Sequence, residues 1–139
     1  MKRMLIIALT VAVLPLGCAT TTERVLDAGD ETQLQKRSYE SRIFDTSDKE
    51  KVLRAIITTL QDLGFVTDRA DFTLGTVSGT KYERYQIKIT VSVRPKGKDR
   101  IMVRANAQFN IEPINDPKQY QDFFFSLEKS LFLAAHEAD

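Results

Sequence analysis

The 139 residues contain one cysteine, one histidine and no tryptophan. A lone thiol has no intramolecular disulfide partner, and one histidine with one cysteine cannot supply the ligand set of a zinc site. Charge of one sign is also lacking, because 20 basic side chains are balanced by 19 acidic ones. The chain therefore has no general basic field, which argues against a nucleic-acid partner.

Long apolar runs are lacking as well. The longest follows Lys2 and Arg3 and extends from Met4 to Leu16, about thirteen residues, whereas a membrane-spanning helix needs roughly twenty. A basic start, a short apolar stretch and a small residue at its end are typical of a secretory signal peptide. We therefore expect the protein to be exported.

The single cysteine stands at the end of this signal, where Gly17 precedes Cys18. The site resembles the lipobox of bacterial lipoproteins, although Pro15 occupies the usual place of a leucine. The resemblance implies that Cys18 carries a diacylglycerol and an N-acyl chain, and it implies no other cofactor. The alternative is an ordinary signal peptide with a chance cysteine.

The residue after the cysteine indicates in which bacterial membrane such a lipoprotein is placed. In lipoproteins of this kind a residue other than Asp at this place implies release to the outer membrane, and this chain has Ala19. Two or more acyl chains anchor a protein stably. The resemblance thus implies a lipid-anchored protein on the periplasmic face of the outer membrane of a Gram-negative bacterium.

Three regions are expected along the chain. Residues 1–18 form the lipoprotein signal, cleaved before Cys18. Residues 19–37 are polar, with too few apolar side chains to bury, and predict a flexible tether. Residues 38–139 are long enough for a single domain.

The first part of this domain predicts a short strand from Ser38 and then a helix. Ser47 and Glu50 have the spacing of a capping box at the start of a helix. Apolar residues then recur at helical spacing from Val52 to Leu63, and Gly64 is suited to the position after the helix end.

Four further strands are predicted over residues 65–69, 74–82, 85–94 and 101–111, with a turn around Ala70 and Asp71. The last two alternate strictly between apolar and polar side chains, which indicates an antiparallel hairpin with one buried and one open face. The inward positions are Ile87, Ile89, Val91, Val93, Ile101, Val103, Ala105, Ala107, Phe109 and Ile111.

The open face of this hairpin is locally basic. Lys88, Arg94 and Arg104 point away from the apolar positions, and Lys81 is a further candidate. These cations are candidate partner-binding residues, and the alternative is a solvated face without a partner.

A second helix is predicted from Asp116 as N-cap and Pro117 as the first helical residue. Its apolar stripe comprises Tyr120, Phe123, Phe124, Leu127, Leu131, Ala134 and Ala135. Phe125 and Phe132 lie together outside this stripe. They either pack against the first helix or form an exposed aromatic strip for a partner.

The predicted order is β-α-β-β-β-β-α, an α+β fold in which two helices pack on one face of an antiparallel sheet of about five strands. This architecture is similar to the helix-grip domains of the accessory lipoprotein C of the outer-membrane barrel-assembly machinery.

Several short motifs resemble a family of small uncharacterised bacterial lipoproteins. They are Phe44-Asp45-Thr46, Leu60-Gln61-Asp62-Leu63-Gly64-Phe65, Leu74-Gly75, Tyr120-Gln121-Asp122-Phe123-Phe124 and Leu131-Phe132-Leu133-Ala134-Ala135-His136. Family members carry a longer insertion where this chain has only Tyr82-Glu83-Arg84. The family supplies no catalytic residue.

Catalytic chemistry finds little support in the residues. His136 stands at the end of the second helix, where a cation complements the helix dipole. Asp68 and Asp71 could act as an acid and a base, but turns also favour aspartate for backbone reasons. We therefore expect a protein that is not an enzyme and binds no metal.

The expected function is that of a non-catalytic, periplasm-facing lipoprotein that docks on an envelope complex for barrel assembly, secretion or efflux. Phe125, Phe132 or the basic sheet face would contact the protein partner. The alternative is a binder or carrier of an apolar ligand or lipid between helices and sheet, or of an anionic envelope glycan on the basic face.

Overall fold

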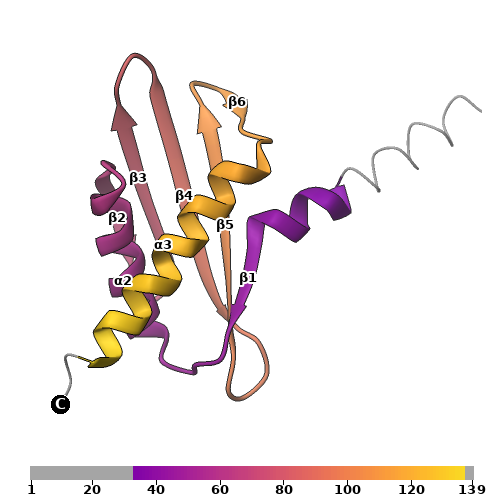
Figure 1. The fold of residues 1–139 in the computed structure, drawn as a ribbon, viewed down its shortest axis with the longest axis vertical. Coiled ribbons are helices and arrows are strands. Elements are labelled where there is room, and N and C mark those ends of the chain that lie inside the picture. Colours follow the sequence, from indigo (N-terminus) through magenta and orange to yellow (C-terminus); the bar gives the residue numbers. More distant parts are fainter. Residues whose placement is uncertain (1–32, 137–139) are drawn as a thin grey trace, which may run out of the picture.

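The computed structural model describes residues 33–136, with side chains described to residue 132. A helical segment over residues 33–40 precedes the elements, which are β1 (Ser41–Phe44), α2 (Lys49–Asp62), β2 (Val66–Asp71), β3 (Thr76–Tyr82), β4 (Gln86–Pro95), β5 (Ile101–Phe109), β6 (Glu112–Pro113) and α3 (Pro117–His136). The sheet order is β1-β5-β4-β3-β2, with every pair antiparallel and β6 added to β5. Helices α2 and α3 lie side by side across one face of the sheet (Figure 1). The predicted α+β fold is thus confirmed.

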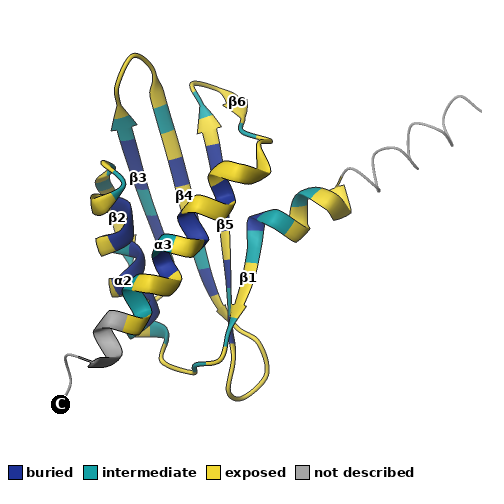
Figure 2. Ribbon diagram, in the orientation of Figure 1, coloured by how far each residue is buried: buried dark blue, intermediate teal, exposed yellow. Residues whose placement is uncertain are grey.

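Strands β4 and β5 form the centre of the sheet, as their alternation predicts. Val91 pairs with Ala105 and Val93 with Val103, and all four side chains are buried beneath the helices (Figure 2). Ile111 is an exception: it was expected to face inward but is 90 % exposed. The reason is that β5 ends at Phe109, after which Asn110 adopts a φ of 53° and turns the chain towards β6.

Helix α2 begins one residue later than its sequence suggests. The carboxylate of Asp48, not the hydroxyl of Ser47, accepts the amide of Lys51 at 2.9 Å, so the predicted capping box is wrong. Glu50 instead binds Arg54 one turn further along, at 2.6 Å. Both Ser47 and Asp48 are good N-caps, and sequence spacing alone does not distinguish them.

The end of α2 follows the prediction. Gly64 has a φ of 83°, its amide donates to Gln61, and the amide of Phe65 donates to Leu60. These two bonds are the Schellman arrangement that ends many helices. They direct the chain from the top of α2 in Figure 1 back along β2.

Strands β2 and β3 are shifted relative to the prediction. The turn between them occupies residues 72–75, beyond the expected Ala70 and Asp71, because the Asp71 carboxylate accepts the amide of Leu74 at 2.8 Å. The turn closes with Gly75 at a φ of 72°, whose carbonyl accepts the amide of Val93 at 2.8 Å.

Helix α3 starts as predicted, with the Asp116 carboxylate accepting the amide of Lys118 at 3.0 Å and Pro117 as the first helical residue. Its apolar stripe completes the core, since Tyr120, Phe123, Phe124 and Leu127 are all at least 97 % buried. None of the helices among the described residues is long and apolar enough to cross a membrane.

The N-terminal helical segment over residues 33–40 is not predicted by the sequence. It replaces the last residues of the expected tether and the first residues of the expected strand, so that β1 begins at Ser41 instead of Ser38. The Tyr39 ring lies 5.3 Å from that of Tyr120, and Glu40 is fully buried and bound to Arg104. Residues 1–32, with Cys18 and most of the predicted tether, lie outside the described part.

Candidate functional site

Three surfaces are candidates for function: the outer flank of α3, the sheet face that the helices leave open, and a hollow between helices and sheet. The first contains the aromatic pair singled out by the sequence. Phe125 is 71 % exposed and Phe132 is 63 % exposed, so neither belongs to the core. We call the surface formed by Gln121, Phe125, Glu128 and Phe132 the α3 flank.

The middle of the α3 flank, at Phe125, faces away from α2. In the core stripe of α3, Phe123 is on the α2 side, near Leu63 and Phe65. Phe124 is on the β1 side, beneath the guanidinium of Arg42 at 5.6 Å from the ring centroid. At about 100° per residue, Phe125 follows Phe124 in the direction away from Phe123. The flank therefore lies along the β1 side of the helix.

A hollow deepens this flank near its C-terminal end. It has a volume of about 230 Å³ and is lined by Phe44, Asp45, Thr46, Lys51, Leu131 and Phe132. The exposed ring of Phe132 thus forms one wall of a concave surface that also includes the end of β1 and the first turn of α2.

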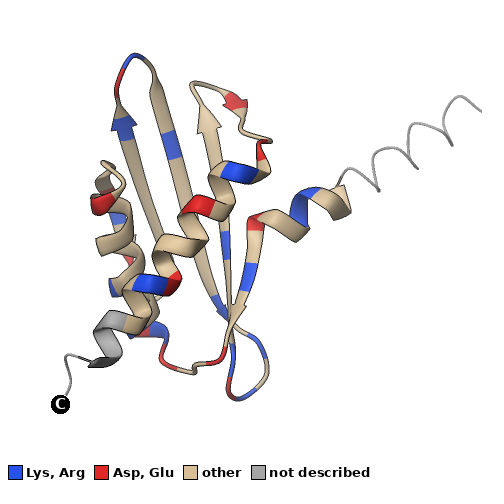
Figure 3. Cartoon of the chain, in the orientation of Figure 1, with Lys and Arg blue, Asp and Glu red and all other residues tan. Residues whose placement is uncertain are grey.

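The open sheet face contains Lys88, Arg94 and Arg104 of the cations that the sequence proposed, but basic residues are spread along β4 and β5 and not gathered in one cluster (Figure 3). Lys88 and Arg94 are six residues apart on β4, which separates them by about 20 Å. Arg94 is opposite Met102, and Arg104 follows two residues later on β5. Of these three cations, the lysine is therefore isolated, and the two arginines lie near each other at a distance from it.

Arg104 is already bound within the domain. Its guanidinium donates to Glu40 at 3.0 Å, and Lys36 approaches the second carboxylate oxygen of Glu40 at 3.7 Å. Glu40 is fully buried, so the pair fixes the helical segment over residues 33–40 to the sheet. This contact explains why an arginine occurs at this position without invoking a partner.

Lys81 does not belong to the open face. It is directly opposite Ile87 in the β3–β4 pairing, and side chains of opposed residues share one face of a sheet. Its ammonium binds Glu83 at 2.8 Å, and its methylene chain runs beside Gly64 at the end of α2. Its assignment to the basic face is thus corrected: Lys81 borders the helix side.

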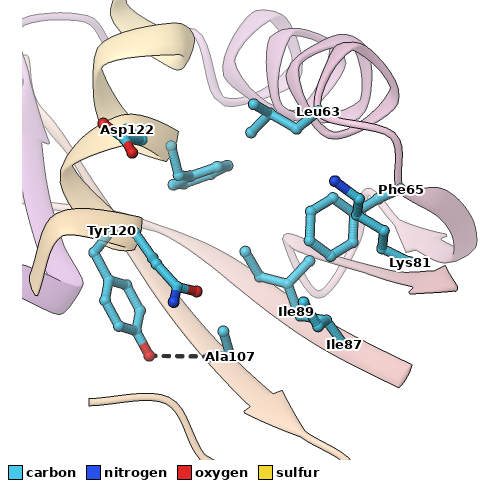
Figure 4. Close-up of a pocket in the computed structure, with 10 residues that line it drawn as sticks. Leu63, Phe65, Lys81, Ile87, Ile89, Ala107, Tyr120 and Asp122 are labelled. Carbon is cyan, nitrogen blue, oxygen red and sulfur yellow. Dashed lines mark hydrogen bonds between the residues drawn. The ribbon is translucent and has the colours of Figure 1, made fainter. Parts of the chain in front are cut away.

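The third surface is a hollow of about 260 Å³ between the end of α2, the start of α3 and the sheet. Its lining is mostly apolar: Leu63, Phe65, Ile87, Ile89, Ala107, Tyr120 and Phe123, with Lys81, Gln119 and Asp122 completing it. Figure 4 shows Phe65 and Lys81 on one side, Tyr120 and Asp122 on the other, and the two isoleucines on the sheet between them.

The Tyr120 hydroxyl is fully engaged beside this hollow. It donates to the Ile114 carbonyl at 2.8 Å and accepts the Ala107 amide at 3.2 Å. Burial raises the pKa of Tyr120 above its usual 10.0; the bond from Ala107 lowers this pKa, and the charge of Glu40 raises it further. The hydroxyl is therefore a neutral structural group.

The two aspartates considered as an acid–base pair have separate structural partners. Asp68 accepts the Thr80 hydroxyl at 2.6 Å, whereas Asp71 caps the β2–β3 turn and lies 3.5 Å from Arg69. Among the residues that the structure describes, no three His, Cys, Asp or Glu side chains converge as a metal site.

Sequence reasoning missed two features of these surfaces. Glu40 is buried although it follows a polar stretch, and only its distant partner Arg104 explains this. No role was expected for the short β3–β4 connection, yet Tyr82 and Tyr85 are exposed on either side of it. Two tyrosines around Glu83-Arg84 in so short a connection were a signal that could have been used.

Comparison with known proteins does not assign the chain. No protein-family model matches it, and a search of the curated proteins found no match.

Proposed function

We propose that this protein is a non-catalytic lipoprotein, anchored through lipid on Cys18 to the periplasmic face of a Gram-negative outer membrane, that docks on an envelope protein complex. The observation that carries the docking part is the exposure of Phe125, 71 %, on the side of α3 that faces away from α2. The anchoring part rests on the order Lys2, Arg3, apolar run, Gly17 and Cys18.

The α3 flank has the composition expected of a docking surface. Burying an exposed phenylalanine against a partner contributes about 1.5–3 kcal/mol, and aromatic anchors beside a concavity are typical of the centre of an interface. The hollow next to Phe132 could receive an apolar side chain of the partner. The flank thus offers both a protruding ring and a recess.

The charged side chains of the α3 flank indicate what kind of partner surface would fit it. Glu128 is exposed on the same flank and has no ion-pair partner among the described residues, whereas the hollow is bordered by one acidic and one basic side chain, Asp45 and Lys51. A complementary surface would therefore be apolar at its centre and basic where it meets Glu128. We infer a folded protein with such a patch, in preference to the anionic lipid surface.

The basic sheet face supports a glycan or headgroup ligand less well. Lys88 and Arg94 are too far apart to hold one small anion together, and Arg104 is bound to Glu40. Docking through α3 therefore remains the better supported function. The apolar-ligand alternative concerns the hollow between helices and sheet, which is a different surface.

Docking can be tested by mild crosslinking in intact cells, affinity purification of the full-length protein and mass spectrometry. Phe125→Ser combined with Phe132→Ser should remove a reproducible envelope partner. The matched control is Val66→Ser, because Val66 is 66 % exposed on β2 and lies far from α3. An unchanged set of crosslinked proteins in the double variant would contradict the proposal.

Anchoring is tested separately, by growing cells with an alkyne-bearing palmitate. The wild-type chain should incorporate the label and fractionate with the outer membrane, whereas Cys18→Ser should lose both properties. If the Cys18→Ser chain stays in the outer membrane, the lipoprotein assignment is wrong, whatever the crosslinking shows.

A further inference from the structure

The hollow between helices and sheet continues along β4, beyond the part of the sheet that α3 covers. A second hollow, of about 310 Å³, is lined by Glu83, Arg84, Tyr85, Ile87 and Phe109 at the tip of the β3–β4 hairpin. Ile87 lines both hollows. They are therefore neighbouring parts of one surface, which we call the apolar trough.

The trough is long. From Ile89 in the first hollow to Tyr85 at the tip, four residues of extended chain span about 13 Å. The rings of Tyr85 and Phe109 lie 4.9 Å apart and form a wall at the outer end. The two hollows, of about 260 and 310 Å³, lie just below and just above the lower end of the roughly 300–1,000 Å³ typical of ligand sites. A ligand that uses both must therefore be elongated.

The floor of the trough is unsuited to binding an extended peptide. It consists of β4 and β5, whose backbone groups are hydrogen-bonded to neighbouring strands or, at Ala107, to Tyr120 and Ile114. A peptide laid on this floor would find no free strand edge, and its own buried amides would lack partners. A hydrocarbon chain carries no such groups.

The charged residues around the trough indicate the charge of the ligand's headgroup. Lys81 and Glu83 neutralise each other at 2.8 Å, and Asp122 lies 4.0 Å from Lys118. Arg84, at the outer end, has no ion-pair partner in the part of the chain that the structure describes. One cation without a counter-charge thus stands where a chain lying in the trough would emerge.

We propose that the apolar trough binds a single acyl chain with an anionic headgroup, the chain lying over Ile87 towards Phe123 and the headgroup at Arg84. This site goes beyond docking through the α3 flank, because it uses other elements and another class of ligand. A guanidinium can hold a carboxylate or phosphate with two parallel hydrogen bonds.

The proposal is tested on the full-length protein in its native membrane, extracted as polymer-bounded lipid particles without detergent. The probe is dodecanoate with a diazirine at the end of its chain. After illumination, we expect adducts on peptides that contain Ile89, Ala107 or Phe123. Adducts spread evenly over the surface, or none at all, would overturn the proposal.

Two variants and two analogues examine the parts of the site. Arg84→Glu should weaken labelling by dodecanoate about tenfold but not labelling by a dodecyltrimethylammonium analogue. The matched control is Arg100→Glu, an exposed arginine in the β4–β5 loop at the opposite end of the strands, which should change neither. Equal loss in both variants, or preference of the wild-type chain for the cationic analogue, would refute the headgroup assignment.

Ala107→Phe should fill the inner part of the trough and reduce labelling at Phe123. Because Ala107 is buried, the melting temperature of the Ala107→Phe variant must be compared with that of the wild-type chain. If this variant unfolds, Ile87→Lys serves instead, since Ile87 is only half-buried and lies where the two hollows meet. Undiminished labelling in a folded variant of either kind would contradict the site.

Discussion

Replacement of Tyr120 by Phe tests how the start of α3 is held on the sheet. The Tyr120 ring is 98 % buried, and its hydroxyl joins the Ala107 amide of β5 to the Ile114 carbonyl before α3. The amide and carbonyl of Ala107 point towards β1, which pairs with β5 only as far as Arg104. Beyond that point, the Tyr120 hydroxyl and the Ile114 amide take the place of a neighbouring strand.

The magnitude follows from these two bonds. Tyr120→Phe keeps the ring but leaves the Ala107 amide and the Ile114 carbonyl without this partner, at a cost of about 1–3 kcal/mol for a buried group. A loss of about 2 kcal/mol lowers the melting temperature of a domain of about 100 residues by roughly 8 °C. Circular dichroism during thermal or urea unfolding measures it.

The control is Tyr82→Phe, because Tyr82 is 72 % exposed and its hydroxyl has no bond among the described residues. This variant should remain within about 0.5 kcal/mol of the wild-type chain. If Tyr120→Phe unfolds at the same temperature as Tyr82→Phe, the hydroxyl does not hold α3 to the sheet and the reasoning fails.

The remaining predictions concern pH, the packing of α3 and two glycines. The pKa of Tyr120 is raised mainly by burial, so the native state holds this proton more tightly than the unfolded chain does. The resulting stability is present below about pH 10 and is lost above it. Between about pH 9 and pH 11, the free energy of unfolding should therefore fall less for Tyr120→Phe than for the wild-type chain. An equal loss would contradict this. Phe124→Ala should cost about 3–5 kcal/mol, whereas Phe125→Ser should change stability by less than about 0.5 kcal/mol; similar effects on urea unfolding would place Phe125 in the core. Gly75→Ala should destabilise more than Gly97→Ala although both have a positive φ, because only the new Cβ at Gly75 would meet a backbone oxygen, that of Val93 at 2.6 Å. Equal melting temperatures would show that this close approach does not matter.

Features that depend on local patterns could be predicted from the sequence. The alternation of Ile87 to Val93 and of Ile101 to Ala107 gave the central hairpin and its buried face. The cap at Asp116 and the glycine at Gly64 gave helix ends. In each case the interacting residues are close in sequence or follow one regular period.

Features that depend on distant contacts could not be predicted. The helical segment over residues 33–40 lacks an apolar stripe of its own, and it is held by Tyr39 against Tyr120 and by Glu40 against Arg104. Lys81 was placed on the wrong face because its side depends on the register with Ile87. An error of one residue in a strand moves a side chain to the opposite face.

The α3 flank lies between these cases. The helical period separates Phe125 and Phe132 from the core stripe, but it does not say which neighbour lies on that side. Only the arrangement of α3, with α2 beside Phe123 and β1 beside Phe124, leaves the flank exposed. Its exposure is a property of the fold, while its use by a partner remains the proposal.

That proposal is tested most directly by a photo-crosslinking amino acid placed at Phe125 in the full-length chain and activated in intact cells, with Val66 as the matched position. Docking through the α3 flank predicts a discrete adduct with an envelope protein from position 125 and none from position 66. Identical patterns from the two positions, or only adducts with lipid and with the chain itself, would contradict it.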